Sequence, residues 1–215
     1  LFNTYLLKEV KEIMQLSDDF RLVKLVKALA LQTGNLVNFN ELSAYTEFSY
    51  AELKKHLNLL EKTFVCKLIH PFGLNKRSEL VKTPKVYFYD SGFRNAVILD
   101  YKFERPDSGA VLENFVFTEL IKNGVLPKFW RTKAKAEVDF VVEKGLAIIP
   151  IEVKTSISPD SLPKSLYGFI EKYKPKNAFV ASQKYFEEKK IGECTVHFTK
   201  LSNLTHVLKN LLQAN

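Results

Sequence analysis

Cysteine is scarce in this sequence, and that scarcity excludes whole classes of protein. The chain has two cysteines, Cys66 and Cys194, which lie far apart and have no histidine at ligand spacing. They predict neither a disulfide framework nor a zinc site, and they fit a reducing, cytoplasmic compartment. Long apolar runs are also missing. No uninterrupted stretch approaches the roughly 20 residues that a membrane-spanning helix needs, so we expect no membrane partner.

The beginning of the sequence, LFNTYLLKEVKEIMQL, has no initiator methionine and lacks the layout of a secretory signal. Its apolar residues recur at helical spacing and predict an amphipathic helix, followed by a second helix that Gly34 and Asn35 end. We interpret the sequence as a fragment of a longer protein.

The composition predicts a soluble globular chain with a basic surface. Of the 215 residues, 46% are hydrophobic, which suffices for one large domain or two small ones. The net charge of +8 favours a polyanionic partner, either nucleic acid or an acidic membrane surface. Many modestly basic proteins bind neither, so charge alone gives weak support.

The first half of the chain predicts a winged helix-turn-helix. Asn40 is the expected N-cap of a short helix that ends at Tyr45. Ser49 and Glu52 have the spacing of a capping box for a second helix, which runs to about Lys62. VCKLIHPF and LVKTPKVYFYD then predict two strands joined by the basic turn GLNKRSE, which form the wing.

Such a module contacts DNA when its second helix enters a major groove and its wing lies against phosphates. The candidate nucleic-acid contacts of the helix and the wing are Lys54, Lys55, Lys76, Arg77, Lys82 and Lys85. The helix carries no arginine and few side chains that read bases, so a protein-interaction adaptor is the alternative.

The second half predicts an α/β (α+β) domain. A helix in SGAVLENFVFTELIKNG precedes three strands, a helix, a strand, another strand and a closing helix. This order predicts a mixed sheet flanked by helices, in which a helix crosses between strands. A polar linker ending at Pro106 places the domain boundary between 1–105 and 106–215.

Two neighbouring strands of this domain carry charged residues among apolar ones. Asp139 lies in AEVDFVVE, and Glu152 and Lys154 lie in IPIEVK, where alternation puts them on one face. A hairpin turning at Lys144 and Gly145 brings Asp139 and Glu152 to the same end of the sheet. Two carboxylates in apolar surroundings predict a shared hard cation, Mg²⁺ or Mn²⁺. Lys154 would orient a water nucleophile or neutralise charge on a phosphate. A solvated salt-bridge ladder is the alternative.

A third carboxylate is expected from the preceding helix. On a helical wheel Glu113 lies away from the polar side made by Asn114, Thr118 and Lys122, so we expect it to face the same cation, directly or through water. Glu119 is a weaker rival.

Basic residues near this cluster are candidate phosphate contacts. They are Arg131 and Lys133, which precede Asp139, and Lys164 on the following helix. Each is equally compatible with an ordinary solvated surface.

The segments GAVLENFVFTEL, FWRTKAKAEVDFVVE and IPIEVKTS resemble the PD-(D/E)XK nuclease superfamily, whose fold is restriction-endonuclease-like. Its four signature positions correspond to Glu113, Asp139, Glu152 and Lys154. More narrowly, these segments, together with TPKVYFYDSGF and the preceding winged helix, resemble the carboxy-terminal half of a prokaryotic AAA-type ATPase family, where the region is a domain of unknown function. That family carries an amino-terminal ATPase domain, whereas this sequence has no G-x-x-x-x-G-K-[ST] phosphate loop. We therefore expect no ATP hydrolysis from this fragment.

These expectations combine into a magnesium-dependent hydrolase of phosphodiesters in nucleic acid, with DNA favoured, at the end of a larger ATPase. The alternatives are a non-catalytic DNA-binding module and a protein-interaction or regulatory module of that ATPase. The expected partners are nucleic acid, the missing ATPase domain and, in an oligomer, further copies of the chain.

Overall fold

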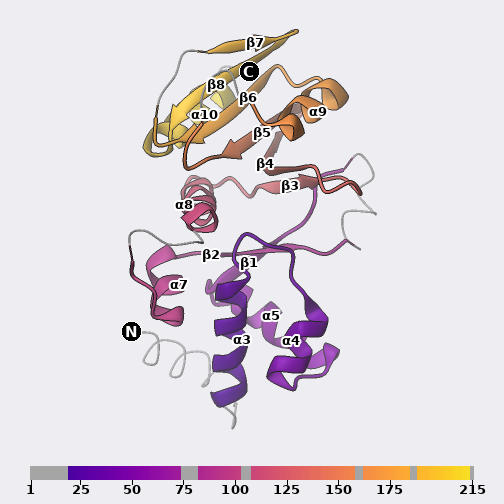
Figure 1. Ribbon diagram of the computed structural model, residues 1–215, viewed down its shortest axis with the longest axis vertical. Helices are drawn as coiled ribbons and strands as arrows, with labels where there is room; N and C mark the ends of the chain where they lie inside the picture. The colour runs from indigo at the N-terminus through magenta and orange to yellow at the C-terminus, as the bar shows by residue number, and fades with distance from the viewer. Residues whose placement is uncertain (1–18, 74–81, 103–107, 158–161, 185–187, 214–215) are drawn as a thin grey trace. The chain divides into compact units, whose positions relative to one another are not determined.

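The protein divides into two compact units. The first comprises Leu1–Ile69 with Thr83–Pro106, and the second comprises His70–Lys82 with Asp107–Asn215. The computed structural model describes residues 19–73, 82–102, 108–157, 162–184 and 188–213 (Figure 1). The helix expected from LFNTYLLKEVKEIMQL lies outside these residues.

The first unit is mainly helical, with one small antiparallel sheet. Cys66 pairs with Phe88, and Ile69 pairs with Lys85. Leucine and valine side chains from the helices pack with this sheet into one buried cluster, which includes Leu25, Leu53 and Val86. Its elements are α3 (Asp19–Leu31), α4 (Phe39–Thr46), α5 (Tyr50–Lys62), β1 (Cys66–Ile69), β2 (Lys85–Phe88) and α7 (Ser91–Ile98).

The two central helices begin at side-chain caps, of which the sequence predicts one correctly. The capping box of α5 is present, since Ser49 Oγ accepts from Glu52 N–H and the Glu52 carboxylate accepts from Ser49 N–H. The N-cap of α4 is Asn38, and the prediction of Asn40 was wrong. Asn38 has extended backbone and its Oδ1 accepts from Glu41 N–H, which starts the helix at Phe39.

Replacing Ser49 with alanine should lower the free energy of unfolding by about 1 kcal/mol, because the amide of Glu52 loses its acceptor. Urea denaturation of the two proteins measures this difference. Ser49→Asp, which keeps a capping oxygen, should remain close to the wild type. Equal losses in both variants would mean that the cap contributes nothing specific.

Helix α5 buries one face and exposes the other, as its sequence pattern predicts. Leu53, Leu57 and Leu60 are buried, while Lys54 and Lys55 are exposed. The pattern did not predict that His56 is buried as well. Its ring stacks on Phe48 with a centroid distance of 4.2 Å, and its Nδ1 lies 2.7 Å from the carbonyl oxygen of Glu52. The histidine thus has a packing role in the described part of this unit.

The second unit is built on a mixed sheet of six strands in the order β3-β4-β5-β6-β8-β7 (Figure 1). The first three strands pair antiparallel, β5, β6 and β8 run parallel, and β7 closes the edge antiparallel to β8. Its elements are α8 (Ser108–Lys122), β3 (Lys128–Arg131), β4 (Glu137–Lys144), β5 (Ala147–Val153), α9 (Lys164–Tyr173), β6 (Asn177–Ser182), β7 (Lys189–Ile191), β8 (Cys194–Lys200) and α10 (Leu204–Gln213).

Helix α9 provides the crossover between the parallel strands β5 and β6. Its residues Leu166, Phe169 and Ile170 pack on Val180 and Val196 of the sheet in one buried cluster. The expected mixed sheet with flanking helices is therefore confirmed at the level of an α/β architecture. The edge strand β7 was not predicted, because three residues are too few to show an alternating pattern. Among the described helices, none is both long enough and apolar enough to cross a bilayer.

The segment after β1, from His70, belongs to the second unit. Phe72 N–H donates to the carbonyl oxygen of Phe129, and Pro71 forms a bridge with the same residue. The Phe72 ring contacts Phe169 and Tyr173, with centroid distances of 5.9 and 5.1 Å. These residues were expected in the wing of the first domain, but an aromatic core in the second unit holds them.

Candidate functional site: a buried carboxylate and lysine cluster

The β4–β5 hairpin places the two predicted strand carboxylates on one face. Val141 pairs with Pro150 and Phe140 pairs with Ile151, so the next pair along the ladder is Asp139 and Glu152. Residues directly opposite in an antiparallel pair point to the same side of the sheet. The connection is as tight as expected, since Lys144 pairs with Ala147.

Both carboxylates are buried, and the backbone of β5 fixes one of them. Asp139 is 7% exposed and Glu152 is 2% exposed. Asp139 Oδ2 accepts a hydrogen bond of 2.7 Å from the backbone N–H of Val153. That bond holds the Asp139 side chain across the hairpin, beside Glu152.

Lys154 completes a compact cluster with these two residues. Its Nζ lies 2.6 Å from Glu152 Oε1, and its side chain is 38% exposed, compared with 3% for Glu152. The ammonium therefore reaches from the surface to a buried carboxylate, while its long side chain keeps access to solvent. The other oxygen, Glu152 Oε2, is buried and makes no hydrogen bond to any residue that the structure describes.

The charges of the cluster shift each other's protonation. The pKa of Glu152 is raised to about 8, first by burial and next by the negative charge of Asp139. Lys154 and its hydrogen bond act in the opposite direction but do not cancel it. Burial also lowers the pKa of Lys154, yet the carboxylates of Glu152, Asp139 and Glu113 outweigh it, so the net direction is upward. The lysine is therefore an ammonium, and Glu152 binds a proton readily.

Glu113 lies within electrostatic range of the cluster. Its charge raises the pKa values of both Glu152 and Lys154. Within the described ranges, however, no three His, Cys, Asp or Glu side chains converge as a ready-made metal site. The structure thus brings together Asp139, Glu152 and Lys154, and the charge of Glu113 on α8 acts on Glu152 and Lys154.

The helix that carries Glu113 is oriented differently from the predicted wheel. Asn114 is fully buried and Thr118 is 8% exposed, whereas both were expected on a polar outer side. Thr118 Oγ1 donates a hydrogen bond to the carbonyl oxygen of Asn114, which lowers the free-energy cost of burying the hydroxyl. Glu119 forms an ion pair of 3.0 Å with Lys122, so it is engaged on its own helix.

The predicted nucleic-acid contacts of the first half have mixed outcomes. Lys54, Lys55 and Lys82 are exposed and available to phosphates. The structure contradicts the prediction that Lys85 is a surface contact. Lys85 lies within β2, pairs with Ile69 and is 2% exposed. Lys76 and Arg77 lie outside the described residues.

The predicted contacts near the carboxylates are largely exposed. Lys133 and Lys164 are exposed, and Arg131 forms an ion pair with Glu137 across the β3–β4 hairpin. Lys135, which the sequence reasoning did not single out, is a further exposed lysine in the same hairpin turn, with a φ of 65°. The ion pair with Glu137 makes the guanidinium of Arg131 less available to a phosphate, whereas Lys133 and Lys135 are exposed at the surface.

These features define a two-unit α/β protein whose mixed sheet carries a buried carboxylate and lysine cluster. Residues 1–103 match the family described as Domain of unknown function (DUF8612), and residues 108–203 match the family described as Domain of unknown function (DUF4143). The first part of the chain is thus similar to DUF8612, and the second part is similar to DUF4143.

Curated relatives are longer than this chain. An uncharacterized protein of Haemophilus influenzae is 24% identical over 198 residues, which cover 89% of this chain and 48% of that protein. An uncharacterized protein of Mycobacterium tuberculosis is 26% identical over 145 residues, which cover 64% of this chain and 32% of that protein. The chain thus spans about half or less of the curated relatives that it matches. Among solved structures, protein VC1899 from Vibrio cholerae aligns with 91% of this chain and 57% of its own, with 11% identity and a TM-score of 0.28.

Proposed function

We propose that the second unit is a PD-(D/E)XK nuclease-like module that hydrolyses phosphodiester bonds with the help of Mg²⁺ or Mn²⁺. The observation that carries the proposal is the burial of the Glu152 carboxyl group and the lack of a hydrogen-bond partner for its Oε2 among the described residues. A carboxylate that is 2% exposed, with one oxygen on an ammonium and the other without a hydrogen-bond partner among the described residues, is costly to bury. A hard cation shared with Asp139 offsets that cost, because it prefers carboxylate oxygens.

Each residue of the cluster has a role in this chemistry. Asp139 and Glu152 would hold the cation, and Glu113 would reach it through water. A divalent cation bound there polarises a phosphoryl oxygen and makes water more acidic. Lys154 is exposed enough to turn from Glu152 toward a bound phosphate, where its ammonium would neutralise the charge that develops as the bond breaks.

The direct test is cleavage by the purified chain of labelled duplex DNA, single-stranded DNA and RNA. We expect products with Mg²⁺ or Mn²⁺ and none with EDTA. If no substrate is cut with either metal, the proposal of hydrolysis is wrong.

We further propose that α4, α5 and the β1–β2 sheet form a winged helix-turn-helix that contacts DNA, and that the chain is the carboxy-terminal part of a cytoplasmic AAA-type ATPase. The exposed pair Lys54 and Lys55 on α5 supports DNA contact, because adjacent lysines on an exposed helix face suit backbone phosphates. The family resemblance and the greater length of the relatives support the ATPase.

Replacing both Lys54 and Lys55 with alanine should weaken DNA binding and reduce the steepness of the slope of log K against log salt by about 2. The reason is that the loss of two phosphate contacts reduces the number of counterions released on binding. Fluorescence anisotropy at several salt concentrations measures this slope. Lys62→Ala, at an exposed position at the end of the same helix, is the matched control and should leave it unchanged. An unchanged slope in the double variant would place the DNA contact elsewhere.

A second candidate is a non-catalytic module that binds nucleic acid without cutting it. The observation that favours it is the Lys154–Glu152 ion pair, which already satisfies one carboxylate oxygen without a metal. This candidate predicts salt-dependent DNA affinity together with an absence of cleavage. Absence of both would favour a protein-interaction role beside the ATPase domain, in an oligomer.

A further inference from the structure

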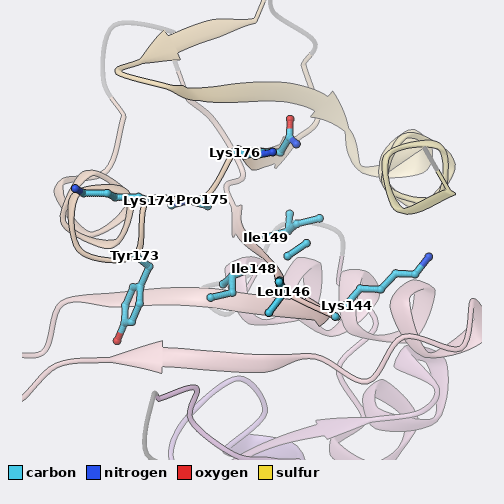
Figure 2. A pocket seen from close by; sticks show the side chains of 11 residues that line it. Lys144, Leu146, Ile148, Ile149, Tyr173, Lys174, Pro175 and Lys176 are labelled. Atoms are coloured by element: carbon cyan, nitrogen blue, oxygen red, sulfur yellow. The ribbon is translucent and has the colours of Figure 1, made fainter. Parts of the chain in front are cut away.

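An open groove of about 620 Å³ lies at the end of β5 away from the carboxylates (Figure 2). Residues 144–149, from the β4–β5 turn and the beginning of β5, form one wall. Residues 173–177, which join α9 to β6, form the other. Glu152 and Lys154 follow at the opposite end of the same strand. The groove is thus separate from the candidate hydrolase site, although both belong to the second unit.

The floor and walls of the groove are apolar and firmly held. Ile148 and Ile149 come from β5, and Tyr173 lies at the end of α9 (Figure 2). The hydroxyl of Tyr173 accepts a hydrogen bond of 3.1 Å from Trp130 Nε1, and its ring packs on Phe169. Leu146, in the turn, is fully exposed. An apolar surface with an exposed leucine at its rim is typical of a contact site for another molecule.

The rim of the groove is positively charged. Lys144, Lys174 and Lys176 all line it and are exposed, and none of the eleven described residues that line it is acidic. The neighbouring Glu143 forms an ion pair of 2.6 Å with Lys128. The side chain of the polar lining residue Asn177 already has a hydrogen-bond partner, since His197 Nε2 lies 2.8 Å from Asn177 Oδ1.

We propose that this groove binds a short segment of a partner protein that carries two or more apolar side chains flanked by Asp or Glu. The apolar walls would take the apolar side chains, and Lys174 and Lys176 would pair with the acidic ones, since complementary charge selects partners and speeds their encounter. The open shape favours a protein segment over a small molecule, because small-molecule sites enclose most of the ligand surface.

Selection of a phage-displayed library of 12-residue peptides on the immobilised full chain tests this proposal. Enriched peptides should contain Asp or Glu beside apolar residues. A labelled enriched peptide should perturb the backbone amides of residues 144–149 and 173–177 in NMR spectra of the full chain. In fluorescence anisotropy its affinity should fall about tenfold or more in the Lys174→Glu/Lys176→Glu variant and about fivefold in Leu146→Asp, because rim charge and apolar contact are lost separately.

Lys190→Glu reverses an exposed charge on β7 of the same sheet and should leave the affinity unchanged. Lys154→Ala should also bind normally, so the result does not depend on hydrolysis. The proposal is overturned by an absence of enrichment, by enriched peptides without acidic residues, or by amide shifts elsewhere. It is equally overturned if dodecyl phosphate perturbs these amides while no peptide does, which would indicate a small-molecule site.

Discussion

Lys154→Ala should reduce phosphodiester cleavage by about 10²–10³-fold, the loss that follows removal of one charge-stabilising donor from a hydrolytic site. In the structure its ammonium is within 2.6 Å of Glu152 and is the positive group of the described cluster. The pKa of Lys154 is raised, so the side chain stays charged throughout the neutral range. Initial rates with a labelled oligonucleotide, measured at saturating Mn²⁺, give the size of the effect.

Two controls make this result specific to catalysis. Lys190→Ala removes an exposed lysine from β7 of the same sheet and should leave the rate unchanged. Binding of Mn²⁺ to Lys154→Ala, followed by calorimetry, should persist because both carboxylates remain. Cleavage by Lys154→Ala at the wild-type rate would contradict the role assigned to the lysine, and loss of metal binding would show that the lysine supports the site rather than the reaction.

Glu152→Gln should abolish measurable binding of Mn²⁺, and binding by the wild type should depend on pH. In the wild type the raised pKa of Glu152, about 8, means that a proton competes with the cation below that pH. Affinity for Mn²⁺ should therefore increase by up to about tenfold for each pH unit from 6 to 8 and level off above it. Calorimetric titrations at pH 6, 7 and 8 measure this trend. Flat affinity across this range would show that Glu152 is not the group that exchanges a proton for the metal.

The same carboxyl group should make the metal-free protein less stable as the pH rises. Its pKa is raised from 4.5 in the unfolded chain to about 8, so between these values the native state binds more protons than the unfolded state. Stability due to Glu152 is therefore present below pH 4.5 and is lost at up to about 1.4 kcal/mol per pH unit as the pH rises toward 8. The raised pKa of Lys154 acts at higher pH and leaves this window unaffected.

Urea denaturation of wild type and Glu152→Gln at pH 5, 6.5 and 8, without metal, measures this contribution. The variant should gain stability relative to the wild type as the pH increases. Glu171→Gln, at an exposed position on α9, is the matched control and should show no such gain. A constant difference between Glu152→Gln and wild type would contradict a raised pKa at this position.

Local sequence signals predicted the local features well. The Ser49 and Glu52 pair predicted the capping box of α5, since both partners lie within one turn of helix. The alternation in β4 and β5, with a glycine between them, predicted the hairpin and thus the common face of Asp139 and Glu152. These features depend on residues close in sequence, so tertiary packing had little opportunity to change them.

Predictions that depended on what packs against an element were less successful. Lys85 looks like a basic wing residue in sequence, yet β2 is buried along its whole length. The polar face expected for α8 is partly buried, because Asn114 and Thr118 point into the unit. The segment after β1 was assigned to a wing, but Phe72 finds an aromatic cluster in the second unit. A single sequence does not reveal the surface on which an element packs.

The sequence by itself determined the order of the described helices and strands apart from β7, and it placed the two carboxylates on one hairpin with the lysine directly after it. Strand alternation and a tight turn fix which of these side chains share a face. Only the tertiary structure decided how deeply Glu152 is buried and that Lys154 pairs with it. It also produced the lysine-rimmed groove, since residues 144–149 and 173–177 meet only after α9 packs against the sheet. Burial and charge environment arise from contacts between distant segments, which is why the pKa of Glu152 could not be predicted from the residues around it in the chain.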